Sequence, residues 1–277
     1  MLRKEKDRLL LILVFSLAGG IFKIAGGIIY HSKSVLVDAL TSMANLASLV
    51  LILAFMKKSS MPPDENHHFG HVRLKFGGSI FTLMAYSFVA GIALMEVLSS
   101  KAYTVSLGAP AMAALGLICY LMAISLSKES RGGPLGYYAT FTVSEVIEGI
   151  TVIASSLTGA IYSYIFDYLG SIALTFYVFY ELLKSFKDLT LKVSDIAPPL
   201  RIVEGIKKSF ESRGLSVEEL KMRYIDEKTL EGHMIIIMDK NNMEEFEEAL
   251  SEAKREAKEK YNAEIFVEFD RKKDNVK

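Results

Sequence analysis

The stretch Asp64-Glu65-Asn66-His67-His68-Phe69-Gly70-His71 lies between two apolar segments that are each long enough to cross a membrane, and it holds three of the chain's five histidines. Asp64, His67 and His71 follow an i, i+3, i+7 spacing, so on a helical path they would share one face. A carboxylate with two imidazoles is a ligand set suited to a first-row divalent metal such as zinc. The stretch therefore predicts a metal site, and the alternative is a solvated polar loop that happens to be rich in histidine.

The apolar residues are unevenly distributed along the chain. Of the 277 residues, 51% are hydrophobic and the mean hydropathy is +0.29, yet the last third is rich in Lys and Glu. This asymmetry predicts a transmembrane domain over residues 1–192 and a cytoplasmic domain over residues 193–277. The net charge is zero, so nothing indicates nucleic acid as a partner. The single cysteine, Cys119, excludes an intramolecular disulfide framework and a cysteine-rich zinc site.

Six segments have the length of about 20 mainly apolar residues that a spanning helix needs. They cover residues 8–30, 34–56, 77–99, 107–127, 137–162 and 165–187. Lys and Arg gather at the first end of segment one and at every second connection, while the opposite side carries only Lys33 and Lys101. Because positive charge stays on the cytoplasmic side, we expect a multi-pass protein of the cell membrane with both termini and the His-rich loop in the cytoplasm.

The run Asp195-Ile196-Ala197-Pro198-Pro199 marks the exit from the membrane, because two prolines end a helix. After it the pattern predicts, in order, a helix, two strands, a helix and a strand, at 199–213, 216–225, 230–239, 242–261 and 262–270. The expected fold is thus an all-α six-helix transmembrane bundle followed by a C-terminal α+β domain (αββαβ, ferredoxin-like). A core of about 80 residues is small, which favours a homodimer.

Polar residues inside two of the spans form a second candidate site. Asp38, Thr41 and Asn45 share an i, i+3, i+7 face of span two, and Glu145 and Glu148 lie one turn apart in span five. An acid at mid-membrane costs roughly 2.5–3.5 kcal/mol on insertion scales, so it usually faces a cavity and has a function. The alternatives are protonated acids that hold neighbouring helices together, an interfacial position for Asp38, and a helix-packing role for Thr41 and Asn45.

At this point the chain resembles the cation diffusion facilitator family of divalent-metal transporters. The segment Pro63–His71 is similar to the family's D-x-x-H-x-x-G-H pattern after span two, and Ser34–Leu40 is similar to its opening of span two. Asp167 before span six and Ser194-Asp195 with the following prolines match further landmarks, so the resemblance covers nearly the whole chain.

The resemblance implies a homodimer that exports zinc, manganese, iron, cobalt or cadmium in exchange for protons. It also implies a transport site made of one Asp/His pair on each of spans two and five, spaced i, i+4. Here those positions hold Thr41 and Asn45, and Phe141 and Glu145, so only Glu145 keeps a carboxylate. A site built from Glu145, Glu148, Asp38, Asn45 and Thr41 would be oxygen-only, and we expect manganese or iron to compete with zinc there.

The leading interpretation is a metal efflux transporter, working as a metal/proton antiporter with an atypical oxygen-rich intramembrane site. Its expected partners are the metal ion (zinc, manganese or iron), protons, membrane lipid and a second copy of the chain. The metal is the substrate and would also serve as a structural ion at Asp64, His67 and His71. The alternative is a non-transporting membrane metal sensor or scaffold with a degenerate transport site. A metalloenzyme is not expected, because the chain has no H-E-x-x-H motif.

Overall fold

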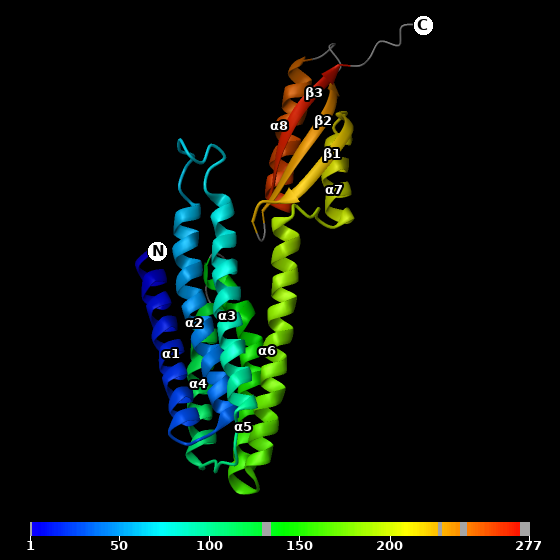
Figure 1. Cartoon of the computed structure of the whole chain (residues 1–277). Coiled ribbons are helices and arrows are strands. Elements are labelled where there is room, and N and C mark those ends of the chain that lie inside the picture. The colour runs from blue at the N-terminus through cyan, green and yellow to red at the C-terminus, as the bar shows by residue number, and fades with distance from the viewer. Residues whose placement is uncertain (1, 129–133, 227–228, 239–242, 272–277) are drawn as a thin grey trace. The chain divides into compact units, whose positions relative to one another are not determined.

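The computed structural model describes residues 2–128, 134–226, 229–238 and 243–271, with the side chains at 2–6, 128, 134–144, 238, 243–244 and 271 outside that description. The chain divides into two compact units. The helical unit comprises Met1–Met61 and Gly77–Phe186, and the α+β unit comprises Pro62–Phe76 and Lys187–Lys277 (Figure 1). The His-rich loop therefore belongs to the same compact unit as the C-terminal segment.

The helical unit is built from long helices. They are α1 (Leu2–Ile28), α2 (Lys33–Ser59), α3 (Lys75–Leu98), α4 (Gly108–Lys128), α5 (Pro134–Ile161) and α6 (Tyr164–Val193). Within the described residues, five helices are long and apolar enough to cross a membrane, namely α1, α2, α3, α4 and α6. The helical membrane region is thus confirmed. A spanning role for α5 stays a prediction, because the side chains of residues 134–144 lie outside the description.

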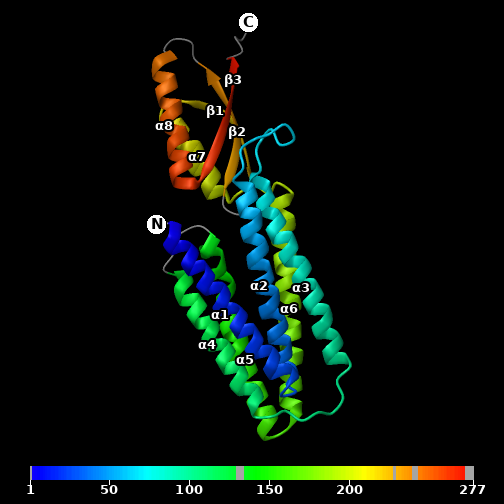
Figure 2. The same cartoon turned by 90° about the vertical axis from the view of Figure 1, so that its left-hand side faces the viewer.

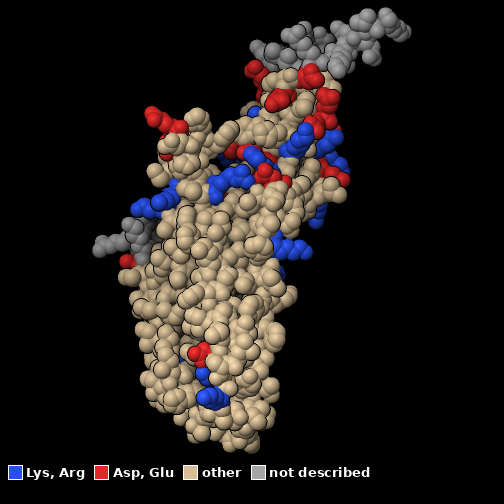
Figure 3. Space-filling model, in the orientation of Figure 1, with Lys and Arg blue, Asp and Glu red and all other residues tan. Residues whose placement is uncertain are grey.

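Four of these helices form a closed ring, in which α1 packs on α2 and α4, and α5 packs on α4 and α2 (Figure 2). Small residues allow the close approach: a Cβ on Gly27 would come within 2.7 Å of the Leu36 backbone. The outer surface of the helical unit carries large apolar side chains such as Phe88 on α3 and Phe176 on α6, 71% and 73% exposed. On the face drawn in Figure 3, the surface of the long helices has few charges. Such a surface suits lipid, so the helical unit has an apolar exterior, while polar residues meet in the interior of the ring.

In the α+β unit, one face of a three-stranded sheet is covered by two helices. The elements are the 3-10 helix η1 (Val72–Leu74), α7 (Leu200–Glu211), β1 (Ser216–Tyr224), β2 (Leu230–Met238), α8 (Met243–Tyr261) and β3 (Ala263–Arg271). The strand order is β1-β2-β3, with β1 antiparallel and β3 parallel to β2. The core gathers Ile206 and Phe210 from α7 with Met234, Ile236 and Ile265 from the sheet. The expected αββαβ order is confirmed, and the closer likeness to a ferredoxin-like fold stays a prediction.

Ion pairs tie the connection after α2 to the C-terminal segment within the α+β unit. Arg73 donates to Asp195 at 3.1 Å, Arg223 reaches the other oxygen of Asp195 at 3.3 Å, and Lys75 contacts Asp226 at 2.5 Å. Asp195 has a φ of 57°, in the left-handed region, where the chain leaves α6. α6 continues to Val193, beyond the predicted end at residue 187. Its last turns carry charged residues, which end the apolar run but are compatible with a helix.

Candidate functional site

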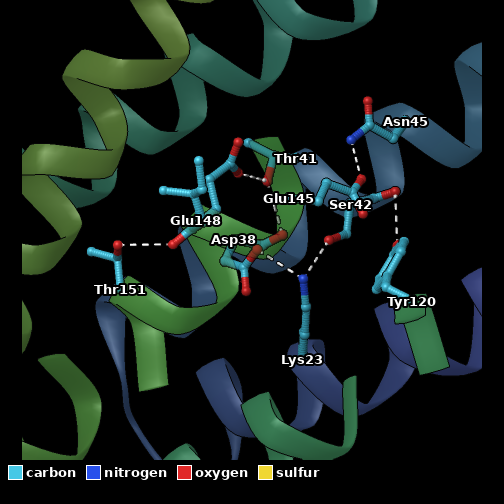
Figure 4. Close-up of polar contacts among 10 residues, drawn as sticks. Lys23, Asp38, Thr41, Ser42, Asn45, Tyr120, Glu145, Glu148 and Thr151 are labelled. Atoms are coloured by element: carbon cyan, nitrogen blue, oxygen red, sulfur yellow. Dashed lines mark hydrogen bonds and ion pairs between the residues drawn. The ribbon is translucent and has the colours of Figure 1, made fainter. Parts of the chain in front are cut away.

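Three acids lie buried inside the helix ring. Asp38 on α2 and Glu145 and Glu148 on α5 are 1%, 3% and 8% exposed, and Thr41, one turn after Asp38, is 2% exposed. The contact between α2 and α5 brings the two sets together, as the shared helix faces predicted. Thr41 Oγ1 lies 3.4 Å from Glu148 Oε2 and 2.9 Å from the backbone oxygen of Asp38 (Figure 4).

Asn45 links the second acid to α3. Its Nδ2 donates to Glu145 Oε1, and its Oδ1 accepts from the hydroxyl of Tyr86 on α3. The amide therefore turns its nitrogen, and not its oxygen, toward the carboxylate. This differs from the expectation that Asn45 adds a neutral oxygen to the set, because an acceptor-only carboxylate requires a donor.

The cluster also contains a cation that the sequence reading missed. Lys23 on α1 is completely buried, and its Nζ lies 2.8 Å from Asp38 Oδ1 and 2.9 Å from Ser42 Oγ. The same ammonium lies 4.5 Å from the centre of the Tyr120 ring on α4. The oxygen-only site stays a prediction, and the structure adds that one oxygen of Asp38 is already paired with a lysine. The available signal was a lone basic residue inside an apolar span, which by default has a function.

Among the described residues, two carboxylate oxygens of the cluster have no hydrogen-bond partner. Asp38 Oδ2 and Glu145 Oε2 are buried and make no hydrogen bond to any described residue. Buried polar atoms normally have partners, and a buried carboxylate oxygen without one is costly. The arrangement can therefore accept a proton or a cation at these atoms.

A turn, and not a helix, gathers the residues of the His-rich loop. Asp64 Oδ1 accepts the backbone N–H groups of Asn66 at 2.9 Å and His67 at 2.7 Å, and Gly70 has a φ of 79°. The helical path considered for this stretch is thus wrong, since the Asp side chain stabilises a turn instead. Asp64, His67 and His71 nevertheless offer ligand atoms that all lie within 4.8 Å of one another.

The contacts of His71 fix which of its nitrogens is free. Its Nδ1 lies 3.1 Å from the carbonyl oxygen of Pro62, which can only accept, so Nδ1 carries the proton. Nε2 then faces Asp64 Oδ2 at 3.3 Å, where two acceptors meet unless a proton or a cation lies between them. Such an outer hydrogen bond orients metal-binding histidines. His68 turns away and contacts the backbone oxygen of Glu65 at 3.1 Å.

The electrostatics of Asp64 suit a cation ligand. Partial desolvation by itself would raise the pKa of this carboxyl. The hydrogen bonds from the backbone of His67 and Asn66, together with the His67 ring at 3.1 Å, outweigh that effect and lower the pKa. Asp64 is therefore ionised well below neutral pH and can serve as the charged member of the set.

Asp167, a landmark at the start of α6, has a structural role. It is fully buried and accepts hydrogen bonds from the Ser32 hydroxyl at 2.6 Å, the Ser34 hydroxyl at 2.5 Å and the Lys33 backbone at 2.8 Å. The hydroxyl of Tyr103, in the connection between α3 and α4, adds a fourth at 2.9 Å. Asp167 thus ties the beginning of α6 to the beginning of α2.

Of the sequence-predicted site residues, the structure gathers Asp38, Thr41, Asn45, Glu145 and Glu148 in one cluster inside the ring, and Asp64, His67 and His71 in the loop. The side chain of Phe141, expected one turn before Glu145, lies outside the described residues. The unpredicted members are Lys23, Ser42, Tyr86 and Tyr120. Tyrosines in apolar spans give no sequence signal that separates a site residue from an ordinary packing residue.

The fold and the buried charges define a class of protein: a multi-pass membrane protein with ionisable side chains inside its helix bundle, followed by an α+β unit. The cation efflux transmembrane domain matches residues 9–192. The chain belongs to this cation efflux family, which confirms the resemblance drawn from the loop and the spans. Members of the family are transporters and not enzymes.

Three relatives illustrate the range of similarity. An uncharacterized transporter of Methanocaldococcus jannaschii is 32% identical over 89 residues, 32% of this chain and 31% of the relative. The manganese efflux system protein MneS of Bacillus subtilis is 29% identical over 99 residues, 36% of this chain and 33% of MneS. Protein p34 of Rickettsia prowazekii is 23% identical over 230 residues, 75% of this chain and 72% of p34. The chain thus spans about a third of the length of the first two relatives.

Proposed function

We propose that this protein exports a divalent metal cation across the cell membrane in exchange for protons. The observation that carries the proposal is the group of three acids, Asp38, Glu145 and Glu148, buried where α2 meets α5. Family membership supports transport of a cation. Similarity to a protein named for manganese efflux, together with carboxylate oxygens as ligands, supports manganese as a substrate beside zinc or iron.

In this proposal Glu145 and Glu148 bind the cation and Asp38, Thr41 and Asn45 complete the surroundings. When the metal leaves, the buried carboxylates face an apolar interior in which unpaired negative charges are costly. Proton uptake neutralises them, so release of metal to one side is coupled to proton entry from that side. Both termini and the His-rich loop lie in the cytoplasm, as the distribution of Lys and Arg supports.

The loop residues Asp64, His67 and His71 bind a second divalent metal, which is a structural ion and not the transported one. Their fit rests on three donor atoms within 4.8 Å and on the Nδ1 hydrogen bond of His71, which leaves Nε2 for the metal. When bound, the metal would supply a cross-link between the two ends of the loop. The small core of the α+β unit, with Phe266 43% exposed on β3, supports association of two copies through this unit.

The test is metal uptake into inverted vesicles under an imposed proton gradient, with manganese, zinc and iron compared. Glu145→Gln keeps the shape of the side chain but removes its charge, so we expect loss of uptake. Glu259→Gln on α8, an exposed acid, is the matched control and should transport as wild type. Wild-type uptake and pH dependence in Glu145→Gln would reject the site.

The alternative of a non-transporting sensor or scaffold is favoured by one observation, the Lys23–Asp38 pair, which already neutralises one of the acids inside the ring. In that case the wild-type protein would show no metal-dependent uptake in the same vesicles, while the loop would still bind metal. The vesicle assay and a binding measurement on the purified protein together separate the two functions.

A further inference from the structure

Lys23 forms an ion pair in the interior of the helix ring. Its side chain and that of Asp38 are both 0% exposed, and Nζ lies 2.8 Å from Asp38 Oδ1. The hydroxyl of Ser42 and the face of Tyr120 complete the surroundings of the ammonium, as Figure 4 shows. These three groups are a carboxylate, a hydroxyl oxygen and an aromatic face, each of which stabilises a positive charge.

The helix packing makes room for this side chain. A Cβ on Gly116 of α4 would come within 2.7 Å of Lys23 Cγ, and a Cβ on Gly19 of α1 within 2.9 Å of the Tyr120 ring. α1 and α4 therefore approach closely at two glycines, and the lysine stem runs past Gly116 toward α2. A lysine that was only tolerated at the lipid face would extend to the membrane surface instead.

The charges of the cluster set its requirement for a cation. Asp38 contacts the Lys23 ammonium directly, and Glu145 and Glu148 are buried in the same cluster through their contacts with Asn45 and Thr41. In the metal-binding state, with all three carboxyls deprotonated, three carboxylates against one ammonium leave a net charge of −2. The unpartnered Asp38 Oδ2 and Glu145 Oε2 show that the lysine alone does not satisfy the acids of the described cluster.

We propose that Lys23 is a specificity-determining residue: a resident cation that neutralises Asp38 and sets the net charge of the transport site at −2, which one divalent ion bound by Glu145 and Glu148 balances. This inference rests on the proposed transport function. It assigns Asp38 to the lysine and not to the metal. Without Lys23 the site would carry a charge of −3 and would favour ions of higher charge.

The experiment is a double-mutant cycle on the purified full-length protein in detergent, with His67→Ala/His71→Ala as the common background so that the loop contributes no site. Mn²⁺ affinity is measured by calorimetry, and Tb³⁺ affinity by luminescence, for Lys23→Gln, Asp38→Asn, the double variant Lys23→Gln/Asp38→Asn, and Glu145→Gln/Glu148→Gln. Gel filtration confirms that each variant is folded.

Removing the ammonium frees a negative charge beside the metal, so Lys23→Gln should bind Mn²⁺ about tenfold or more tightly, and its preference for Tb³⁺ over Mn²⁺ should rise by about tenfold. Asp38→Asn leaves the ammonium uncompensated and should weaken Mn²⁺ binding by about tenfold. The double variant should return to within about threefold of the background protein. A purely structural role for Lys23 would not change the Tb³⁺ to Mn²⁺ ratio.

The outcomes distinguish failure of the proposed Lys23 role from failure of the proposed transport site. If Glu145→Gln/Glu148→Gln abolishes Mn²⁺ binding but Lys23→Gln matches the background protein in both affinities, the role of Lys23 is overturned and the transport site stands. If the background protein binds no Mn²⁺, the proposed function fails. If Lys23→Gln does not fold, the comparison of Asp38→Asn with the double variant decides, and equal affinities overturn the inference.

Discussion

Replacing Asp167 by Ala should strongly destabilise the helical unit. Among the described residues five hydrogen bonds converge on this carboxylate, and the two shortest come from the hydroxyls of Ser32 and Ser34, which are fully buried residues. A hydrogen bond to a charged group contributes about 1.5–3 kcal/mol, so the two serine bonds alone account for about 4 kcal/mol. Tyr103 and the Lys33 backbone add less, because Tyr103 is only half-buried and can reach water.

Asp167→Asn should cost about half as much, because it keeps an acceptor of the same shape but loses the charge that strengthens each bond. For a chain of this size 1 kcal/mol shifts the Tm by about 2–4 °C, so we expect a drop of about 10 °C for the Ala variant and about 5 °C for the Asn variant. Asp188→Asn is the matched control: it lies on the same helix, its side chain is 65% exposed, and its surface pair with Lys192 contributes little.

The assay is thermal unfolding in detergent micelles, followed with a thiol-reactive dye on Cys119, the chain's only cysteine. Cys119 lies half-buried on α4, so the dye reports loss of packing in the helix ring. Tryptophan fluorescence does not serve, because the chain has no tryptophan. An Asp167→Ala protein that melts within about 2 °C of Asp188→Asn would refute the reasoning.

Three further predictions concern the ring, the α+β unit and the loop. Gly116→Ala should lower the stability of the ring by about 2 kcal/mol and reduce metal uptake, because the new methyl meets Lys23, whereas Gly91→Ala, with nothing within 4 Å, should do neither. Hydrogen bonds from Ser209 and Arg213 lower the pKa of Glu256, so this carboxylate stabilises the α+β unit at neutral pH, and the contribution is lost as the pH falls through the lowered pKa. Hydrogen exchange of α7 should show this acid loss in wild type but little further loss in Glu256→Gln, with Glu259→Gln behaving as wild type. Calorimetry on His67→Ala/His71→Ala should show one metal site fewer than wild type, and unchanged stoichiometry would contradict the loop site.

The elements were predictable from the sequence because their signals are local. The length of the apolar runs placed α1 to α4, and the alternation of β2 and β3 with a charged helix placed the αββαβ order within a few residues. The end of α6 was missed for a related reason: hydropathy stops near 187, but hydrogen bonding carries the helix through Val193. The hydropathy of the sequence thus predicts which part of a helix meets lipid better than it predicts where the helix ends.

The His-rich loop shows a second limit of prediction from sequence, which concerns the geometry of a site. Ligand types and spacing identified Asp64, His67 and His71, but a helical path was the wrong geometry for them. The Asp64 side chain accepts two backbone N–H groups and forms a turn, so the residue that looks like a ligand also shapes the loop. Spacing alone did not separate these two uses of one carboxylate, because both place it three residues before a histidine.

The role of Lys23 was not predicted because each helix was interpreted from its own sequence pattern alone. Span two contains Asp38 as an acid among apolar residues, and span one contains Lys23 as a single basic residue. Neither pattern predicts that the two side chains contact each other. The pairing appears only when Gly19 and Gly116 bring α1 and α4 close enough to direct the lysine stem inward. Removing one partner of a buried ion pair costs about 3–5 kcal/mol, so the two residues are best treated as one unit. Counted that way, the cluster offers a metal two free carboxylates and not three, which is the charge that a divalent ion requires.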